Sequence, residues 1–243
     1  MKAETTILPK LWTIPDAIRN RIGRDAGPQR AMLEEGHLLI ILHQLPEPDQ
    51  HHRKAALFWR QPEGEWRSNV SGVGLTGLQE LLQSYDQRLN QLEDAENAAS
   101  TAAAYHAVLE SLAPVLRASR GLQRAMQQAR EMMKSERDLI NFRDQAASVE
   151  RTAEILLQDA QFGLNFIVAK QAESQAANAQ KMAATGHRLN LLAALFFPLT
   201  ALASVFGMEI HSGLSDTTGN FWLILGAGIF MGLITCAAIG KRN

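Results

Sequence analysis

The last fifty or so residues constrain the fold of this chain most, because they contain two long apolar segments without a charged residue. These segments, residues 189–206 and 221–239, hold 18 and 19 residues. Helices of these lengths extend about 27 to 29 Å at about 1.5 Å per residue, close to the roughly 30 Å hydrocarbon core of a bilayer. Both follow a long, mostly polar region and so are not a cleaved signal. We therefore predict a transmembrane hairpin over residues 188–243, with an outer loop at 207–220.

The charges beside the two segments predict the orientation of the hairpin. Lys181 and Arg188 precede the first segment, Lys241 and Arg242 follow the second, and the loop contains neither Lys nor Arg. This bias places both termini in the cytoplasm and the chain in the inner or plasma membrane as a multi-pass protein. The single Cys allows no internal disulfide, and the net charge of −1 argues against nucleic-acid binding.

Residues 1–74 are expected to form a small cytoplasmic α/β cap. Two short segments, each opened by Pro and followed by Gly, are predicted as helices: Pro15–Ile22 and Pro28–Glu35. Three apolar runs bounded by turn residues are predicted as strands, the last two forming a hairpin: His37–His43, Lys54–Arg60 and Trp66–Val70.

Residues 75–187 are rich in helix-forming residues and are expected to form a cytoplasmic helical stalk or funnel. Helices are predicted at Leu75–Glu93 and at Thr101–Met133, the second broken or kinked at Pro114. A third begins near Glu136 and meets no Pro before the first apolar segment. The predicted fold is therefore mainly α, with a small N-terminal α/β cap and a long stalk helix that continues into the two-helix hairpin.

A stripe of small and polar residues follows this long helix at alternating steps of three and four. Its members are Ala169, Ala172, Ala176, Ala179, Ala183, Gly186, Asn190, Ala193, Phe197, Thr200 and Ser204. A 3.5-residue period is typical of helices that pack against their own copies. Because all members except Phe197 are small or polar, the stripe favours close helix approach or the lining of a water-filled pore. The alternative is that Ala is simply abundant, since Ala177 and Ala184 lie off the stripe.

Two segments resemble the CorA metal-ion transporters. One is Phe197-Pro198-Leu199-Thr200 followed by Phe206-Gly207-Met208, and the other is the stretch 142–151 with the uninterrupted helix after it. The resemblance covers roughly residue 136 to the end. It implies a homopentameric funnel whose first spans line a central pore for cations, including divalent metal ions such as Mg²⁺.

The signature Gly207-Met208-Glu209 departs from the Gly-Met-Asn of the resembled family at its third position. Several copies of Glu209 would place a ring of carboxylates where the family has neutral amides. Such a ring attracts cations, so Glu209 is the candidate metal-contacting residue. The alternative is that Glu209 is an ordinary solvated residue at the membrane surface.

The remaining candidates follow from the stripe and the resemblance together. The expected pore-lining residues are Gly186, Asn190, Ala193, Phe197, Thr200 and Ser204. The expected constrictions are Leu189, which the resemblance favours over its neighbour Asn190, and Phe197, whose rings would form a dewetted barrier. The alternative for Phe197 is packing against lipid or a neighbouring helix.

No spacing of residues supports an enzyme or a bound cofactor. The run Gly72-Val-Gly-Leu-Thr-Gly77 matches a dinucleotide-binding pattern, but no second parallel strand with an acidic residue follows it. We therefore expect a self-associating membrane channel or transporter for cations, with a divalent cation as permeating ion or regulatory ligand. Two alternatives remain: an anion-conducting or poorly selective channel, and a non-transporting assembly anchored by the hairpin. The sequence does not name the ion.

Overall fold

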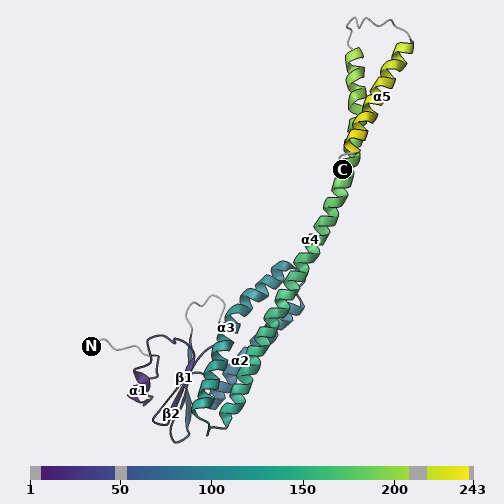
Figure 1. Cartoon of the computed structure of the whole chain (residues 1–243). Helices are drawn as coiled ribbons and strands as arrows, with labels where there is room; N and C mark the ends of the chain where they lie inside the picture. Colours follow the sequence, from purple (N-terminus) through teal and green to yellow (C-terminus); the bar gives the residue numbers. More distant parts are fainter. Residues whose placement is uncertain (1–6, 47–53, 208–217, 241–243) are drawn as a thin grey trace. The chain divides into compact units, whose positions relative to one another are not determined.

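The computed structural model describes residues 7–46, 54–207 and 218–240 (Figure 1). Near the C-terminus it describes the backbone but not the side chains of residues 203, 205–207, 218, 220, 221, 224, 236 and 238–240. The helices are α1 (Asp16–Arg19), α2 (Leu75–Asn97), α3 (Ala102–Met132), α4 (Asp138–Gly207) and α5 (Thr218–Gly240). The strands are β1 (Arg30–Glu34), β2 (His37–His43), β3 (Ala55–Arg60) and β4 (Trp66–Ser68). The chain divides into two units, Met1–Ala169 and Lys170–Asn243, which are described in turn.

The four strands of the first unit form one antiparallel sheet in the order β1-β2-β3-β4. The predicted strands at 37–43, 54–60 and 66–70 are confirmed, with β4 ending at Ser68. The predicted helix at Pro28–Glu35 is wrong, because β1 occupies residues 30–34. Glu35 and Gly36 have φ values of 50° and 78°, and Glu34 pairs with His37. Two residues with positive φ make the tight turn of a β-hairpin, so Gly36 turns a strand here and does not end a helix.

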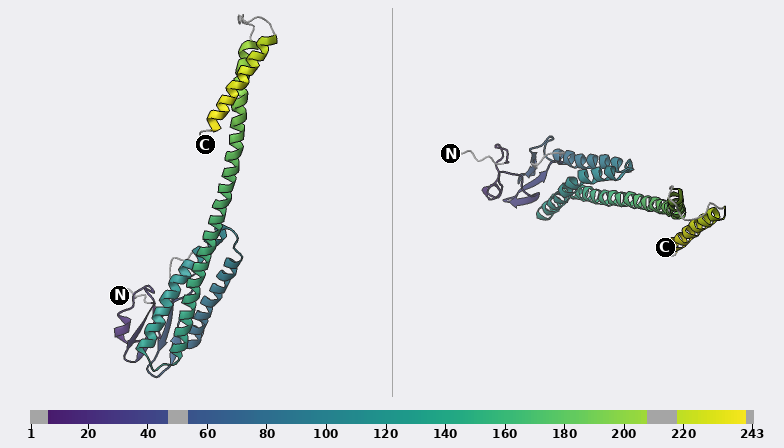
Figure 2. Two further views of the ribbon diagram at one scale, coloured as in Figure 1. Left: turned by 45° about the vertical axis from the view of Figure 1, so that its right-hand side comes forward. Right: turned by 90° about the horizontal axis from the view of Figure 1, so that it is seen from above.

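The sheet is buried on both faces, which explains why β2 and β3 are continuously apolar. Leu39 and Ile41 of β2 pack with Trp59 and the N-terminal segment that includes Trp12 and Ile18. The alternate residues, such as Ile40 and Phe58, pack on the other face against α2, α3 and α4. Figures 1 and 2 show these three helices on the side of the sheet away from α1. The predicted helix at 15–22 is present only as the single turn of α1.

The helices α2, α3 and α4 lie where the sequence predicts helices. The hydroxyl of Thr101 accepts a hydrogen bond from the Ala104 amide and thereby caps the start of α3. α3 is a single helix through Pro114, so the predicted break there is wrong. α4 is helical from Asp138 to Gly207, which confirms the predicted uninterrupted helix. The buried residues of α4 recur at steps of three and four: Leu139, Phe142, Ala146, Val149, Ala153, Leu156 and Ala160.

A glutamine side chain joins the sheet to α3. Gln29 donates from Nε2 to the Ala118 carbonyl at 2.7 Å and accepts at Oε1 from the His43 amide at 3.2 Å. A Cβ atom at Gly121 would overlap the Gln29 amide. Gly121 therefore leaves the space that the glutamine bridge occupies.

Tyr85 also contacts the end of β2. Its hydroxyl donates to the His43 carbonyl at 3.1 Å, and burial raises the pKa of Tyr85.

The glycines of the run 72–77 have a structural role in the connection from β4 to α2. Gly72 and Gly74 have φ values of 87° and 59°, which favour glycine. A Cβ atom at Gly72 would lie 2.8 Å from the backbone of Gly77, and one at Gly74 would lie 2.8 Å from the Trp66 carbonyl. These glycines therefore let the connection fold closely on itself.

The second unit contains the last part of α4 and α5, which lie side by side (Figures 1 and 2). Among the residues that the structure describes, no helix is both long enough and apolar enough to cross a membrane. The predicted spans at 189–206 and 221–239 both include residues whose side chains are outside this description. Residues 208–217 of the predicted loop also lie outside it.

Gly163 in α4 offers a test of packing in the first unit, because a Cβ atom there would overlap the ring of Tyr105 on α3. Replacing a mid-helix Gly by Ala normally stabilises by about 0.5–1 kcal/mol. In a Tyr105→Ala background, we expect Gly163→Ala to increase the stability of the fold by this amount. In the wild-type background the increase should be absent or reversed, and thermal unfolding of the full chain measures both changes. Equal gains in both backgrounds would show that the ring does not restrict position 163.

Candidate functional site

Two glycines of α5 set the close approach of the two helices in the second unit. A Cβ atom at Gly232 would lie 2.9 Å from the carbonyl oxygen of Leu195, and one at Gly228 would lie 3.0 Å from the Leu199 side chain and 3.3 Å from that of Leu202. Gly-x-x-x-Gly spacing puts both glycines on one helix face, and such faces let helix backbones come close together. The face of α4 that carries these three leucines is therefore covered by α5.

The predicted pore-lining residues lie on a different face of α4. Asn190, Phe197, Thr200 and Ser204 are exposed, while Gly186 and Ala193 are half-buried. At about 100° per residue, position 197 lies roughly 160° around the helix from position 195. The structure thus brings these residues together on the side of α4 away from α5.

Both predicted constriction residues are large, apolar and exposed. Phe197 is 70 % exposed and Leu189 is 61 % exposed, and the neighbouring Asn190 is exposed as well. The Thr200 hydroxyl lies 3.0 Å from the carbonyl oxygens of both Phe196 and Phe197. This hydroxyl is satisfied within its own helix, so it presents an oxygen with free lone pairs at the surface of α4.

The signature segment falls at the edge of the described residues. Gly207 is the last residue of α4. Met208 and Glu209 lie outside the described residues, so the role predicted for Glu209 remains a prediction.

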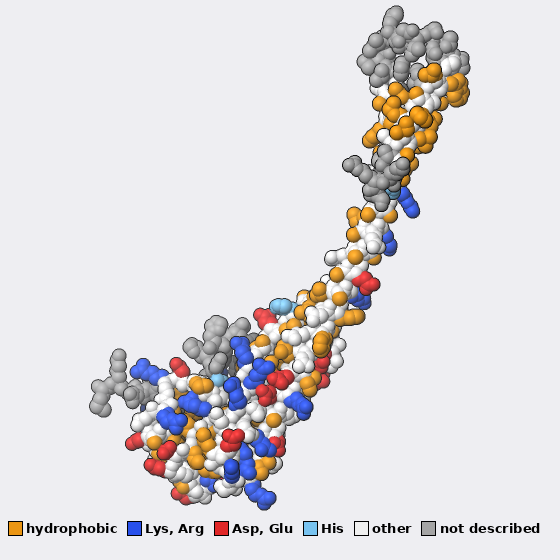
Figure 3. Space-filling model, in the orientation of Figure 1, with side chains coloured by type: hydrophobic (Ala, Val, Ile, Leu, Met, Phe, Trp, Pro, Cys, Tyr) orange, Lys and Arg blue, Asp and Glu red, His pale blue; other side chains and the backbone are white. Residues whose placement is uncertain are grey.

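The hairpin surface is uncharged throughout its described part. No Lys, Arg, Asp or Glu occurs in residues 189–207 or 218–240. Figure 3 shows hydrophobic side chains over the visible face of these two helices, whereas charged side chains gather on the first unit. Large exposed side chains of α5 include Trp222, Leu223, Phe230 and Leu233, which are 57–69 % exposed. Several large exposed apolar side chains on one hairpin are typical of a site of contact with a membrane or another protein.

Three acidic residues before and along the first part of α4 pair with arginines. Glu136 lies 2.6 Å from Arg60 of β3, and Glu154 lies 3.0 Å from Arg120 of α3. Asp144 is paired with its neighbour Arg143 at 2.6 Å. Within residues 7–46, 54–207 and 218–240, no cluster of three or more His, Cys, Asp or Glu side chains could hold a metal ion.

Glu150, on the same stretch of α4, has a perturbed acidity. Burial, and then the nearby carboxylate of Glu154, raise the pKa of Glu150, and the guanidinium groups of Arg120 and Arg124 oppose that rise. Its charge therefore opposes folding where it is ionised.

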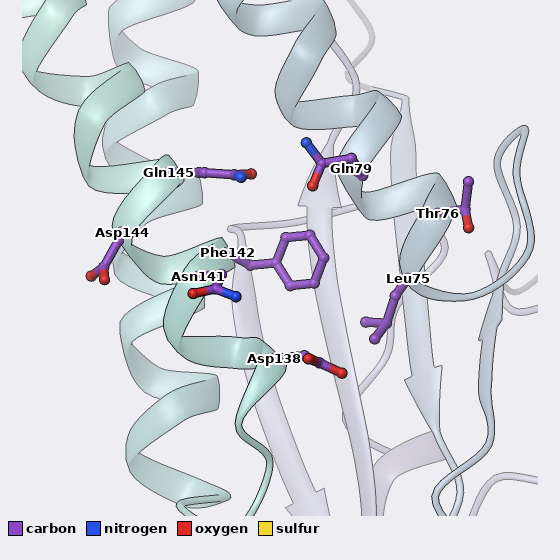
Figure 4. A pocket seen from close by; sticks show the side chains of 8 residues that line it. All are labelled: Leu75, Thr76, Gln79, Asp138, Asn141, Phe142, Asp144 and Gln145. Carbon is purple, nitrogen blue, oxygen red and sulfur yellow. The ribbon is translucent and has the colours of Figure 1, made fainter.

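A pocket of about 630 Å³ lies between the start of α2 and the start of α4. Its lining residues are Leu75, Thr76, Gln79, Asp138, Asn141, Phe142, Asp144 and Gln145 (Figure 4). In Figure 4 Phe142 and Gln145 point from α4 toward α2, whereas Asp144 points away. Gln145 Oε1 is buried and has no hydrogen-bond partner among the described residues. The lining combines amides, carboxylates and the Thr76 hydroxyl with the apolar Leu75 and Phe142, so it offers both polar and apolar contacts.

Sequence reasoning missed the two residue types that define the hairpin geometry. Gly228 and Gly232 carry a recognisable Gly-x-x-x-Gly signal, which the small-residue pattern of the preceding helix obscured. Thr235 lies 3.1 Å from the Ala194 carbonyl of α4. No sequence signal marks Thr235, because this contact depends on how the two helices are aligned.

Comparison with known proteins identifies the family. Residues 18–241 match the family described as CorA-like Mg²⁺ transporter protein. The solved cytoplasmic domain of ZntB from Vibrio parahaemolyticus is similar in fold, with a TM-score of 0.52 and 15 % identity over 66 % of this chain and 80 % of that one.

Two full-length structures are similar at lower TM-scores. The CorA magnesium transporter of Methanocaldococcus jannaschii gives 0.38, with 13 % identity over 88 % of this chain and 79 % of that one. The full-length CmaX protein gives 0.43, with 14 % identity over 88 % and 78 %. A comparison with curated proteins found no match. Because the family match covers nearly the whole chain, this protein belongs to the family of CorA-like Mg²⁺ transporter proteins, which are transporters and not enzymes.

Proposed function

We propose that this chain is a homo-oligomeric, pentameric membrane channel that passes cations through a central pore lined by α4. One observation carries the proposal. In the second unit, α5 covers the face of α4 with Leu195, Leu199 and Leu202, and the opposite face with Asn190, Phe197 and Thr200 is exposed. A face that combines an amide, a hydroxyl and one aromatic ring fits a wet pathway with a single apolar barrier.

The apolar hairpin supports insertion in a membrane. Its described residues carry no charge and expose several large hydrophobic side chains. The flanking Lys and Arg residues of the sequence favour an orientation with both termini in the cytoplasm of the inner or plasma membrane. On this reading residues 1–74 form a cytoplasmic cap, residues 75–187 a funnel and residues 188–243 the membrane hairpin.

Two features of α4 support self-association. The small-residue stripe from Ala169 to Ser204 repeats at the period of helices that pack on their own copies. In the first unit, Ile155, Phe162 and Phe166 lie along one face of α4 and are 51–68 % exposed. Exposed aromatic side chains in a row are typical of protein interfaces.

The proposal is tested by assembly and ion flux measured on one preparation. We expect an oligomer in mild detergent by light scattering, and passive cation uptake after reconstitution into liposomes. Ala183→Leu adds three carbons on the stripe and should disrupt assembly, whereas the adjacent Ala184→Leu, off the stripe, should not. A monomer, or an oligomer without flux, would refute the channel, and a reversal potential that follows the anion gradient would refute cation selectivity.

Phe197→Ala should increase ion leak, because removal of one exposed ring from every copy widens and wets the barrier. The matched control is Phe196→Ala, which removes the adjacent exposed ring from another face of α4 and should leave the leak unchanged. Flux and thermal stability are measured together. A lower melting temperature with unchanged leak would show that Phe197 packs against a neighbouring helix.

Glu209→Gln should reduce cation uptake at low ionic strength, because it removes a ring of carboxylates at the outer mouth without changing side-chain shape. The effect should shrink near 1 M salt, where the Debye length is about 3 Å. Asp216→Asn removes the other acidic residue of the same loop and should have a smaller effect. Wild-type uptake by the Glu209 variant at low salt would place this carboxylate outside the ion pathway.

A further inference from the structure

Pro198 leaves one backbone acceptor of α4 without its helical donor. In an α-helix the amide of each residue donates to the carbonyl four residues earlier, and proline has no amide hydrogen. The acceptor that Pro198 fails to serve is the Ala194 carbonyl. Both residues are half-buried. An unsatisfied carbonyl in an apolar environment is strongly unfavourable, so its partner matters for the stability of this segment.

The partner comes from the other helix of the hairpin. Thr235 of α5 has its hydroxyl oxygen 3.1 Å from the Ala194 carbonyl oxygen. The same hydroxyl lies 2.8 Å from the carbonyl of Met231 and 2.9 Å from that of Gly232, in its own helix. A threonine hydroxyl has one proton to donate. The carbonyls of Met231 and Gly232 can accept hydrogen bonds from backbone amides within α5. The Ala194 carbonyl has no such helical donor, so it is the acceptor that most needs this proton.

The glycine face of α5 makes this contact geometrically accessible. A Cβ atom at Gly232 would lie 2.9 Å from the Leu195 carbonyl oxygen and 3.1 Å from the Leu195 Cα atom. The backbones therefore come close beside Ala194, and the short side chain of Thr235, three residues beyond Gly232, reaches across. A longer residue at position 232 would separate the helices and break the contact.

We propose that Thr235 is a positioning residue for ion permeation: its hydroxyl replaces the amide that Pro198 lacks and thereby fixes the segment of α4 that carries Phe197 and Thr200. This inference rests on the proposed function, because it assigns those two residues to the pore. Thr235 itself contacts the Ala194 carbonyl, and it acts on Phe197 and Thr200 only through the backbone at residues 194–198.

A double-mutant cycle between positions 235 and 198 tests the inference on the full-length protein. Thr235→Val preserves shape and removes the donor, so the unfolding equilibrium in a denaturing-detergent titration should shift by roughly three- to fifteenfold, the range measured for hydrogen bonds between membrane helices. Flux per assembled oligomer should change by a similar factor if the bond biases the conducting conformation. In a Pro198→Ala background, the new amide serves Ala194, and Thr235→Val should then change either quantity by less than about twofold.

Two controls make the result specific. Thr235→Ser keeps the donor and should restore wild-type flux. Thr185→Val removes a hydroxyl that lies 3.0 Å from the carbonyl four residues earlier in α4 itself, and it should have no effect. If Thr235→Val fails to assemble, recovery of assembly by the added Pro198→Ala substitution supports the inference, and failure to recover overturns it.

The outcomes separate this inference from the channel proposal. Equal effects of Thr235→Val in both backgrounds would overturn the role of Thr235, whether or not the protein conducts. Coupling in the detergent titration with unchanged flux would also overturn it, because the contact would then not position the pathway. A third outcome is that the detergent titration shows coupling between positions 235 and 198 but the wild-type protein carries no ions. That result would refute the channel and would still establish the bond between Thr235 and Ala194.

Discussion

The burial of one face of α4 against α2, α3 and the sheet is the constraint on which the first unit depends. That face recurs at steps of three and four from Leu139 to Ala160, and several of its members are alanines with no exposed surface. Alanines on this face allow a closer approach of neighbouring elements than larger side chains would. Among the described residues, none buries the remaining circumference of α4 within the first unit. The exposed Ile155, Phe162 and Phe166 are the apolar part of that remainder.

Glycine acts as a spacer in both units, but what fills the space differs. At Gly163 the space is taken by the aromatic ring of Tyr105, which can rotate away. At Gly232 it is taken by the backbone of Leu195, which cannot move without moving α4. A larger residue at position 163 can therefore be accommodated by displacement of a side chain. At position 232 an added Cβ atom would change the spacing of the two helices.

Much of the fold could be predicted because its signals are local. The three long helices follow from composition, the stripe on α4 follows from its 3.5-residue period, and β2 follows from its apolar run between turn residues. β1 could not be identified in this way, because Pro28 and Gly36 bound a helix and a hairpin strand equally well. The pairing of Glu34 with His37 decides between them, and that pairing depends on a neighbouring strand.

The candidate site could be predicted in part for the same reason. A periodic stripe on one helix identifies residues that share a face, so Asn190, Phe197 and Thr200 could be grouped from the sequence. The side of α4 against which α5 packs could not be predicted from the sequence, because it depends on the alignment of two helices. Thr235 shows this limit clearly, because only the position of Ala194 opposite it distinguishes it from any other threonine in an apolar helix.

The bridge from Gln29 to α3 has a consequence for how this family diverges. Gln29 reaches the Ala118 carbonyl through the space that Gly121 leaves open. A side chain at position 121 would displace the amide and leave the His43 amide at the end of β2 without its side-chain acceptor. Neither position can therefore drift alone without loss of a hydrogen bond between the sheet and the helix. Among relatives that keep this sheet, Gln at 29 and Gly at 121 should be inherited, and lost, as a pair.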